Sequence, residues 1–201
     1  HDIDAGTNPP DRTTRLNVER EYFNLPPTFT NTLEPCRGYY DFVRGPVHFF
    51  MLHGGYDNSN VNRQADGVDA ASAQAEWFYA KAKASKARWK IAIVHQQPYT
   101  SDLGRAPGYT ALRWPFKDYV NLVLNGHGHS YERLEVDGLP YIMNGLGGAS
   151  IDSTWGTISP YSLVRYNAAY GAMRVEADCD SFTAEFINTN GDVIDTLELT
   201  K

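Results

Sequence analysis

Two short, uninterrupted apolar runs constrain the fold of this chain more than any other feature. Residues 91–94 read Ile-Ala-Ile-Val, and residues 122–124 read Leu-Val-Leu. Strands with one face in water alternate apolar and polar residues, whereas strands covered on both faces are apolar throughout. We therefore predict two buried, neighbouring strands, with a helix at residues 69–86 packed on their outer face.

The predicted helix is supported by apolar spacing and by charge. Asp69 stands where an N-cap is expected, and lysines near the other end complement the negative helix terminus. The apolar residues at helical spacing are Ala70, Ala73, Trp77, Phe78 and Ala80.

The rest of the chain favours short strands and turns. The first 35 residues are rich in proline and polar residues and predict a long loop. Further strands are predicted at residues 39–43, 47–52 and 139–143, a short helix at 112–119, and a terminal antiparallel meander at 172–177, 182–188 and 193–199. A purely alternating α/β chain would not end in three hairpin-joined strands. We therefore expect a single α+β domain spanning residues 1–201, a layered αββα sandwich that ends in the meander.

Composition excludes several classes of function. The 201 residues carry a formal net charge of −6, which disfavours a nucleic-acid partner. No apolar run approaches the length of a membrane span, so no membrane partner is expected. Cys36 and Cys179 allow at most one disulfide and cannot build a cysteine-based zinc site.

Three of the six histidines stand where the two buried strands end. His95 directly follows the first strand, and His127 and His129 follow the second, with Gly128 between them. Ligands gather at the carboxyl ends of strands in open sheets, and imidazole is a common metal ligand. This placement favours a metal site, although His127 and His129 could instead be ordinary polar loop residues. His48 and His53 are interpreted as structural.

The sequence around these histidines resembles that of a known family. Residues 126–133, Gly-His-Gly-His-Ser-Tyr-Glu-Arg, look like the Gly-His-x-His-x-Tyr-Glu-Arg block of purple acid phosphatases and their relatives among calcineurin-like metallophosphoesterases. Residues 94–101 are similar to the family's preceding His-x-x-Pro-Tyr block. Residues 141–148 are similar to the glycine-rich segment that ends the matching region. The resemblance spans residues 38–148 or so and implies a metallophosphoesterase sandwich.

The resemblance also implies roles for individual residues. His95 and His127 would bind one divalent metal ion and His129 a second ion, with iron, zinc or manganese as candidates. His1 would lie near the leaving group as a proton donor or phosphate contact. Tyr131, Glu132 and Arg133 would support the histidine loop, with substrate binding by Arg133 as the alternative. Arg105 is either solvent-exposed or a phosphate contact.

The family's upstream metal motifs are missing from this sequence. It contains no Asp-x-His or Gly-Asn-His triplet, and its Gly191-Asp192 pair lies near the end. The opening pair, His1-Asp2, resembles the tail of a Gly-Asn-His-Asp block. We therefore expect the chain to be the C-terminal half of a metallophosphoesterase domain, lacking the carboxylate that bridges the two metals. A separate N-terminal segment is then a candidate partner.

Two functions follow from this reading. The first is hydrolysis of phosphoric esters, including small-molecule phosphate esters, by a dinuclear metal centre. The second is a non-catalytic metal-binding or interaction module built on the half-fold. The resemblance also implies a secreted or periplasmic location.

Overall fold

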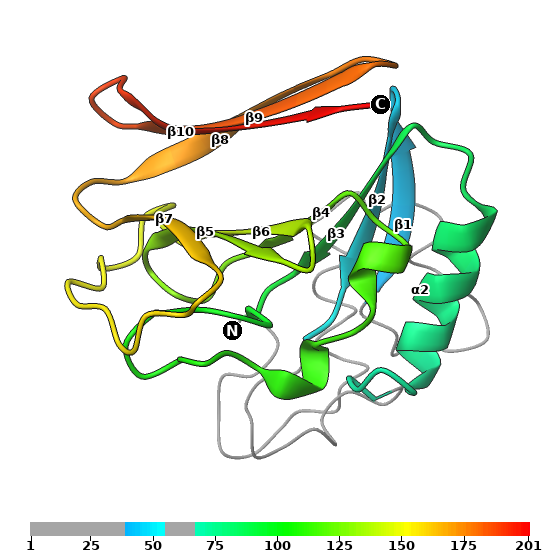
Figure 1. Cartoon of the computed structure of the whole chain (residues 1–201), viewed down its shortest axis with the longest axis horizontal. Coiled ribbons are helices and arrows are strands. Elements are labelled where there is room, and N and C mark those ends of the chain that lie inside the picture. The colour runs from blue at the N-terminus through cyan, green and yellow to red at the C-terminus, as the bar shows by residue number, and fades with distance from the viewer. Residues whose placement is uncertain (1–38, 55–66) are drawn as a thin grey trace, which may run out of the picture.

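The computed structural model describes residues 39–54 and 67–201 (Figure 1). The predicted loop over the first 35 residues, His1 and Cys36 lie outside these residues. Within them, seven strands form one sheet in the order β1-β2-β3-β4-β6-β5-β7. Its strands are β1 (Tyr40–Arg44), β2 (Val47–Leu52), β3 (Trp89–Val94), β4 (Leu122–Asn125), β5 (Tyr131–Val136), β6 (Leu139–Asn144) and β7 (Ser162–Tyr166).

The two apolar runs form adjacent parallel strands, as predicted. Strand β3 pairs with β4 so that Ala92 lies opposite Val123. Successive side chains point to opposite faces of the sheet. Ala92 and Val123 accordingly join the core on the helix side, whereas Ile91 and Leu122 join the core on the other side. The uniform apolarity of these strands thus reflects burial on both faces.

Helix α2 (Ala73–Ala84) covers one face of this sheet, also as predicted (Figure 1). Phe78 is fully buried, and its ring centroid lies 5.3 Å from that of Phe50 on β2. The predicted cap is wrong, however. Ser72 is the N-cap, and its hydroxyl accepts a hydrogen bond from the backbone N–H of Ala75 at 3.2 Å. Asp69 instead accepts the N–H of Ala71, so its carboxylate closes the turn that precedes the helix.

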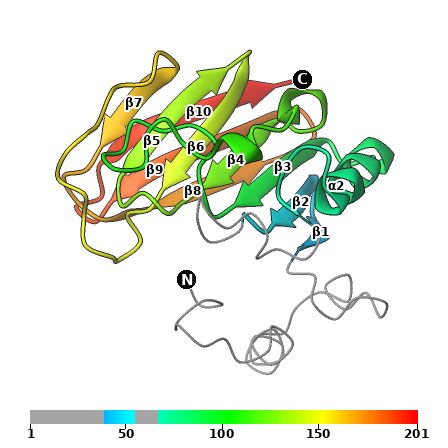
Figure 2. The ribbon, with the colours of Figure 1, turned by 90° about the horizontal axis from the view of Figure 1, so that it is seen from below.

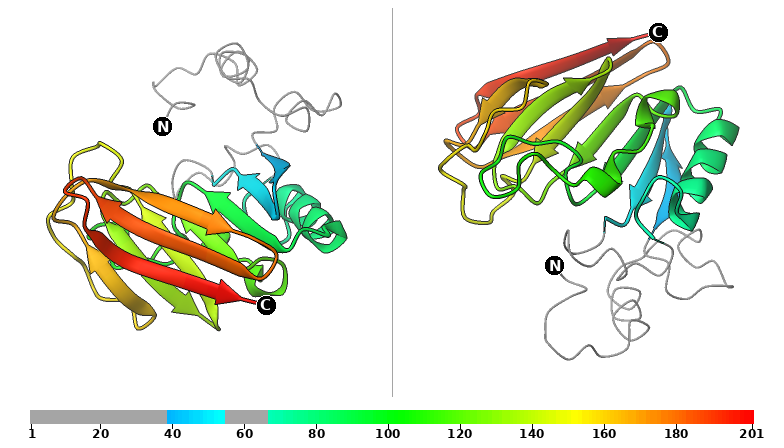
Figure 3. Two further views of the ribbon diagram at one scale, coloured as in Figure 1. Left: turned by 90° about the horizontal axis from the view of Figure 1, so that it is seen from above. Right: turned by 60° about the horizontal axis from the view of Figure 1, so that its bottom comes forward.

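The terminal meander is confirmed as a separate three-stranded sheet. It consists of β8 (Gly171–Ala177), β9 (Ser181–Asn188) and β10 (Val193–Thr200), in the order β10-β9-β8. This sheet lies over the face of the large sheet opposite α2 (Figures 2 and 3). Its Phe186 stacks on Tyr131 of β5, with ring centroids 4.3 Å apart. The layers are therefore helix, sheet and sheet, in agreement with the predicted layered α+β fold.

Two parts of the fold differ from the prediction. Strands β5 and β7 were not predicted, and the short helix expected at residues 112–119 is two 3₁₀ turns, Thr110–Leu112 and Phe116–Asp118. Pro115 separates the turns because proline disfavours helical backbone at the preceding residue. The indole of Trp114 also donates to the carbonyl of Val68 at 2.9 Å, which draws the segment toward the start of α2.

Candidate metal centre

His95 and His127 meet at the carboxyl edge of β3 and β4. The backbone N–H of Gly126 donates to the carbonyl of His95 at 3.0 Å, which ties the two strand ends together. Nε2 of His95 then lies 3.2 Å from Nδ1 of His127. The predicted placement of both histidines at one edge is confirmed.

The backbone of His127 has an unusual conformation. Its φ of 66° lies in the left-handed region, which few non-glycine residues occupy. Residues held in such sparsely populated regions gather at functional sites, where the surrounding structure fixes them. The residue with this backbone conformation is also the one whose ring contacts His95.

The environment of His127 keeps its ring neutral. Burial, together with the nearby His95 and Arg105, lowers the pKa of His127 to about 4. A neutral imidazole carries one lone pair for a metal, whereas the protonated ring has none. The other ring nitrogen of His127, Nε2, lies 3.1 Å from the hydroxyl of Tyr109.

His129 is held by the segment that follows β6. Its Nδ1 lies 2.8 Å from the carbonyl oxygen of Ser150. A carbonyl only accepts hydrogen bonds, so Nδ1 carries the proton, and in the neutral ring the lone pair is on Nε2. The backbone N–H of His129 donates to Asp152 at 2.9 Å, and the N–H of Asp152 donates back to the carbonyl of His129 at 3.0 Å.

Gly128 lies between the two histidines because no side chain fits there. A Cβ at this position would lie 2.6 Å from the sulfur of Met143 and 3.0 Å from a carboxylate oxygen of Asp102. Glycine at this position therefore leaves the space that Met143 and Asp102 occupy.

The three residues that follow the histidine loop hold other segments in place. The fully buried carboxylate of Glu132 accepts bonds from the backbone N–H of Ser101 at 2.8 Å and from the Thr100 hydroxyl at 3.0 Å. These contacts fix the loop after His95. Arg133 forms an ion pair with Asp195 of β10 at 2.6 Å, which is a contact between the sheets.

Arg105 is paired rather than plainly solvent-exposed, and its alternative role as a phosphate contact stays a prediction. The guanidinium lies between two carboxylates, 2.7 Å from Asp102 and 2.8 Å from Asp152. Sequence reasoning missed Asp102, Asp152 and Tyr109 as neighbours of the histidines, because they come from loops without a recognisable motif. His48 is structural, as interpreted, and contacts Asp41 at 2.9 Å and the Ser85 hydroxyl at 2.8 Å.

The described residues fit part of a metal centre. Two side-chain amides at the same strand ends, those of Gln97 and Asn125, are buried without a hydrogen-bond partner in the structure. Unpaired buried polar groups are rare and mark places where another group or water is missing. Within residues 39–54 and 67–201, however, no three His, Cys, Asp or Glu side chains are grouped to hold a metal ion. His95 and His127 thus form a pair that His129 does not complete as a three-residue group within these ranges, and His1 lies outside them.

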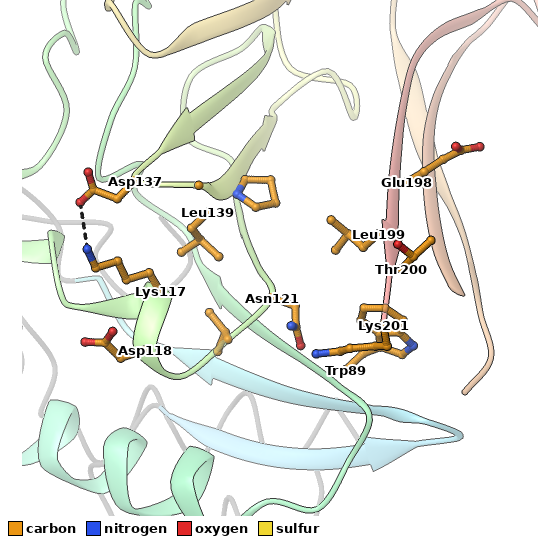
Figure 4. A pocket seen from close by; sticks show the side chains of 13 residues that line it. Trp89, Lys117, Asp118, Asn121, Asp137, Leu139, Glu198, Leu199, Thr200 and Lys201 are labelled. Atoms are coloured by element: carbon orange, nitrogen blue, oxygen red, sulfur yellow. Dashed lines mark hydrogen bonds and ion pairs between the residues drawn. The ribbon is translucent and has the colours of Figure 1, made fainter. Parts of the chain in front are cut away.

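A cavity of about 490 Å³ lies at the opposite end of the parallel strands (Figure 4). It is lined by Trp89 at the start of β3 and Leu139 at the start of β6, together with the end of β10. Lys117 and Asp137 form an ion pair at 3.5 Å on its rim. None of the three histidines lines this cavity, so the candidate centre and the cavity are separate.

Comparison with family models identifies the chain. Residues 1–131 match the model described as calcineurin-like phosphoesterase, and residues 138–196 match the model described as iron/zinc purple acid phosphatase-like protein C. The chain therefore belongs to the calcineurin-like phosphoesterase family, and the resemblance noted in the sequence is confirmed. A search of curated proteins finds no match.

Solved structures show the same fold at low sequence identity. A purple acid phosphatase, PPD1 from yellow lupin seeds, matches with a TM-score of 0.69 and 18% identity over 83% of this chain and 33% of its own. GAP50, the anchor in the inner membrane complex of Plasmodium, matches with a TM-score of 0.59 and 19% identity over 82% of this chain and 55% of its own. PhoD matches with a TM-score of 0.59 and 14% identity over 94% of this chain and 45% of its own. The chain thus spans between a third and just over half of each neighbour. No helix in the described part of the chain is long and apolar enough to cross a bilayer.

Proposed function

We propose that the chain carries half of a metal centre that hydrolyses phosphoric esters, with His95, His127 and His129 as its ligands. The observation that carries this proposal is the approach of His95 Nε2 to His127 Nδ1 at 3.2 Å, at the carboxyl edge of the sheet. Together with the family membership, this pair favours a hydrolase over a binding module.

The proposed ligand roles follow the geometry of the rings. His95 and His127 would hold one ion, and His129 would hold a second through Nε2, with iron, zinc or manganese as candidates. When bound, such ions supply Lewis-acid polarisation of phosphate oxygens and of the attacking water. His1 is proposed as a proton donor to the leaving group.

The protein's own contribution is to hold neutral ligands in a fixed arrangement. Burial keeps His127 unprotonated near neutral pH, so its lone pair is available without loss of a proton. The Ser150 carbonyl orients the ring of His129, and Glu132 fixes the loop that follows His95. Polar partners of this kind set the tautomer and orientation of metal-binding histidines in general.

We further propose that residues 1–201 act as one domain with a small-molecule phosphate ester as substrate. A separate N-terminal segment that supplies the bridging carboxylate is a proposed partner. The purple acid phosphatase-like match supports a secreted or periplasmic location as part of the same proposal.

Metal binding tests the proposal directly. The chain is titrated with zinc or manganese, and bound metal is measured by elemental analysis after dialysis. His127→Ala is expected to lower the metal content, because water does not replace a lost imidazole with equal affinity. His48→Asn removes a histidine that is bound to Asp41 and Ser85 instead, and this control should retain the metal. Equal metal content in wild type and His127→Ala would reject the ligand role.

A non-catalytic metal-binding or interaction module is the second candidate. It is favoured by the lack of a three-residue acid, histidine or cysteine group within the described ranges. One structural neighbour, GAP50, is described as an anchor, so the fold is compatible with such a role. Stoichiometric metal binding with no turnover, even after the missing segment is supplied, would favour this candidate.

A further inference from the structure

The side chain of Arg105 lies at the centre of a network that surrounds the histidine loop. Its Nη1 is 2.7 Å from Asp102 Oδ1 and 2.8 Å from Asp152 Oδ2. The second oxygen of Asp102 accepts the hydroxyl of Ser130 at 2.9 Å, and Asp152 Oδ2 also accepts the N–H of His129 at 2.9 Å. The Arg105 guanidinium therefore connects two carboxylates, one of which binds Ser130 and the other its neighbour His129.

Burial makes this network sensitive to the loss of charge. The Asp102 side chain is 1% exposed, and those of Arg105 and Asp152 are 23% and 30% exposed. Burial raises the pKa of Asp102, while hydrogen bonds from Arg105 and Ser130 oppose the rise. Without Arg105, two carboxylates would face each other with little solvent between them, which is unfavourable.

The segment that contains Asp152 also contacts one ring nitrogen of His129, Nδ1. The segment from Ser150 to Asp152 binds His129 three times, through the ring Nδ1, the backbone N–H and the backbone carbonyl. The same region is fastened to the loop after His95, since Gly156 N–H donates to the Ser101 carbonyl at 2.7 Å. A shift of Asp152 would thus move the Ser150 carbonyl away from the ring.

We propose that Arg105 and Asp152 are positioning residues for His129, holding its ring in the Nδ1–H tautomer with Nε2 directed to the metal. This inference rests on the proposed function for the metal, but the tautomer itself is a property of the metal-free chain. Arg105 acts through Asp152.

The test compares five variants of the 201-residue chain, one of which, His129→Ala, removes the proposed ligand itself. Asp152→Ala removes the acceptor for the His129 N–H, and Arg105→Gln removes the charge between the carboxylates. Asp152→Asn is the conservative variant, because its amide oxygen still accepts the same N–H. Arg174→Gln is the matched control, since it breaks an exposed arginine ion pair with Glu185 on the three-stranded sheet.

Two measurements are made on each variant. Long-range ¹H–¹⁵N spectra of the metal-free chain report the tautomer of His129, and titration with zinc reports metal affinity. Asp152→Ala and Arg105→Gln are expected to lose the fixed Nδ1–H tautomer and to bind zinc about tenfold more weakly or worse. Asp152→Asn should recover most of both properties, and Arg174→Gln should change neither.

The outcomes separate this inference from the proposed function. Retention of the tautomer and of zinc affinity in Asp152→Ala and Arg105→Gln would overturn the inference. The inference would also be overturned if Asp152→Asn lost the tautomer and zinc affinity to the same extent and this loss followed a fall in melting temperature. If His129→Ala binds zinc as tightly as wild type, the ligand role of His129 in the proposed function fails, and the tautomer spectra still decide the positioning role.

Discussion

Single residues in this structure act through buried hydrogen bonds more than through exposed charge. The histidine pair could be predicted, because each ring directly follows an apolar strand and parallel strand ends share an edge. The partners of His129 could not be predicted, because Asp152 lies 23 residues further along and Arg105 contacts it across 47 residues. No local pattern encodes contacts between two irregular loops.

Glu132→Gln tests a buried carboxylate near the site that accepts three hydrogen bonds. Glu132 accepts Thr100 Oγ1, Ser101 N–H and Ser101 Oγ, at 3.0, 2.8 and 2.5 Å. A glutamine would turn an NH₂ group toward at least one of these donors. We expect a loss of about 1–3 kcal/mol in the free energy of unfolding, measured by urea denaturation. Glu135→Gln, at an exposed position on the same strand, should change it by no more than a few tenths. Equal effects of the two variants would contradict this account.

Gly128→Ala tests the space between the histidines. The new Cβ would lie 2.6 Å from the Met143 sulfur, closer than real Cβ contacts allow, so the loop or Met143 must shift. We expect a lower melting temperature and weaker zinc binding than in wild type. Gly147→Ala has no atom within 4 Å of its Cβ and serves as the control. Wild-type zinc affinity in Gly128→Ala would show that the loop tolerates the shift.

At the scale of elements, strands were predicted correctly where both of their faces are buried against apolar side chains. Strands β3 and β4 are apolar because both faces are covered, and this signal is visible in sequence. Strand β5 was missed because Glu132 and Arg133 are charged, yet the first binds a loop and the second binds Asp195 on the other sheet. Strand β7 alternates between half-buried and exposed residues and gives no clear signal.

The start of α2 gives a prediction at the same scale. Ser72→Ala removes the N-cap acceptor for Ala75 N–H and is expected to cost about 1 kcal/mol of stability. Asp69→Ala removes only the exposed contact with Ala71 N–H and should cost less. Thermal unfolding of both variants by circular dichroism measures the difference. A larger effect of Asp69→Ala would restore Asp69 as the functional cap.

At the scale of the whole molecule, one polar cluster fastens the two sheets together. Asp195 on β10 accepts the Tyr131 hydroxyl at 2.8 Å and both Nε and Nη2 of Arg133, at 2.6 and 2.9 Å. The Arg133 and Asp195 side chains are 18% and 6% exposed. Because Tyr131 and Arg133 flank Glu132, the same three residues connect the second sheet to the loop after His95. Through these three residues, the three-stranded sheet therefore supports the candidate metal centre.

The last prediction concerns turnover by the 201-residue chain alone. We expect it to hydrolyse p-nitrophenyl phosphate poorly or not at all, even with added zinc, manganese or iron. His95, His127 and His129 supply imidazoles, but no residue identified here supplies the bridging carboxylate that would hold two ions together. Two adjacent ions together activate the attacking water and clamp the phosphoryl oxygens, so one weakly held ion would lose most of the rate.

The same assay is repeated after mixing with a segment that carries the missing Asp-x-His and Gly-Asp motifs. A rise in turnover that His127→Ala abolishes would show that the two pieces form one centre. Robust turnover by the chain alone would mean that acidic residues outside the described ranges, with Asp2 and Asp4 as candidates, complete the site. In that case the expectation of a half-centre would be wrong, while the ligand roles of the three histidines would still be open to the metal titration.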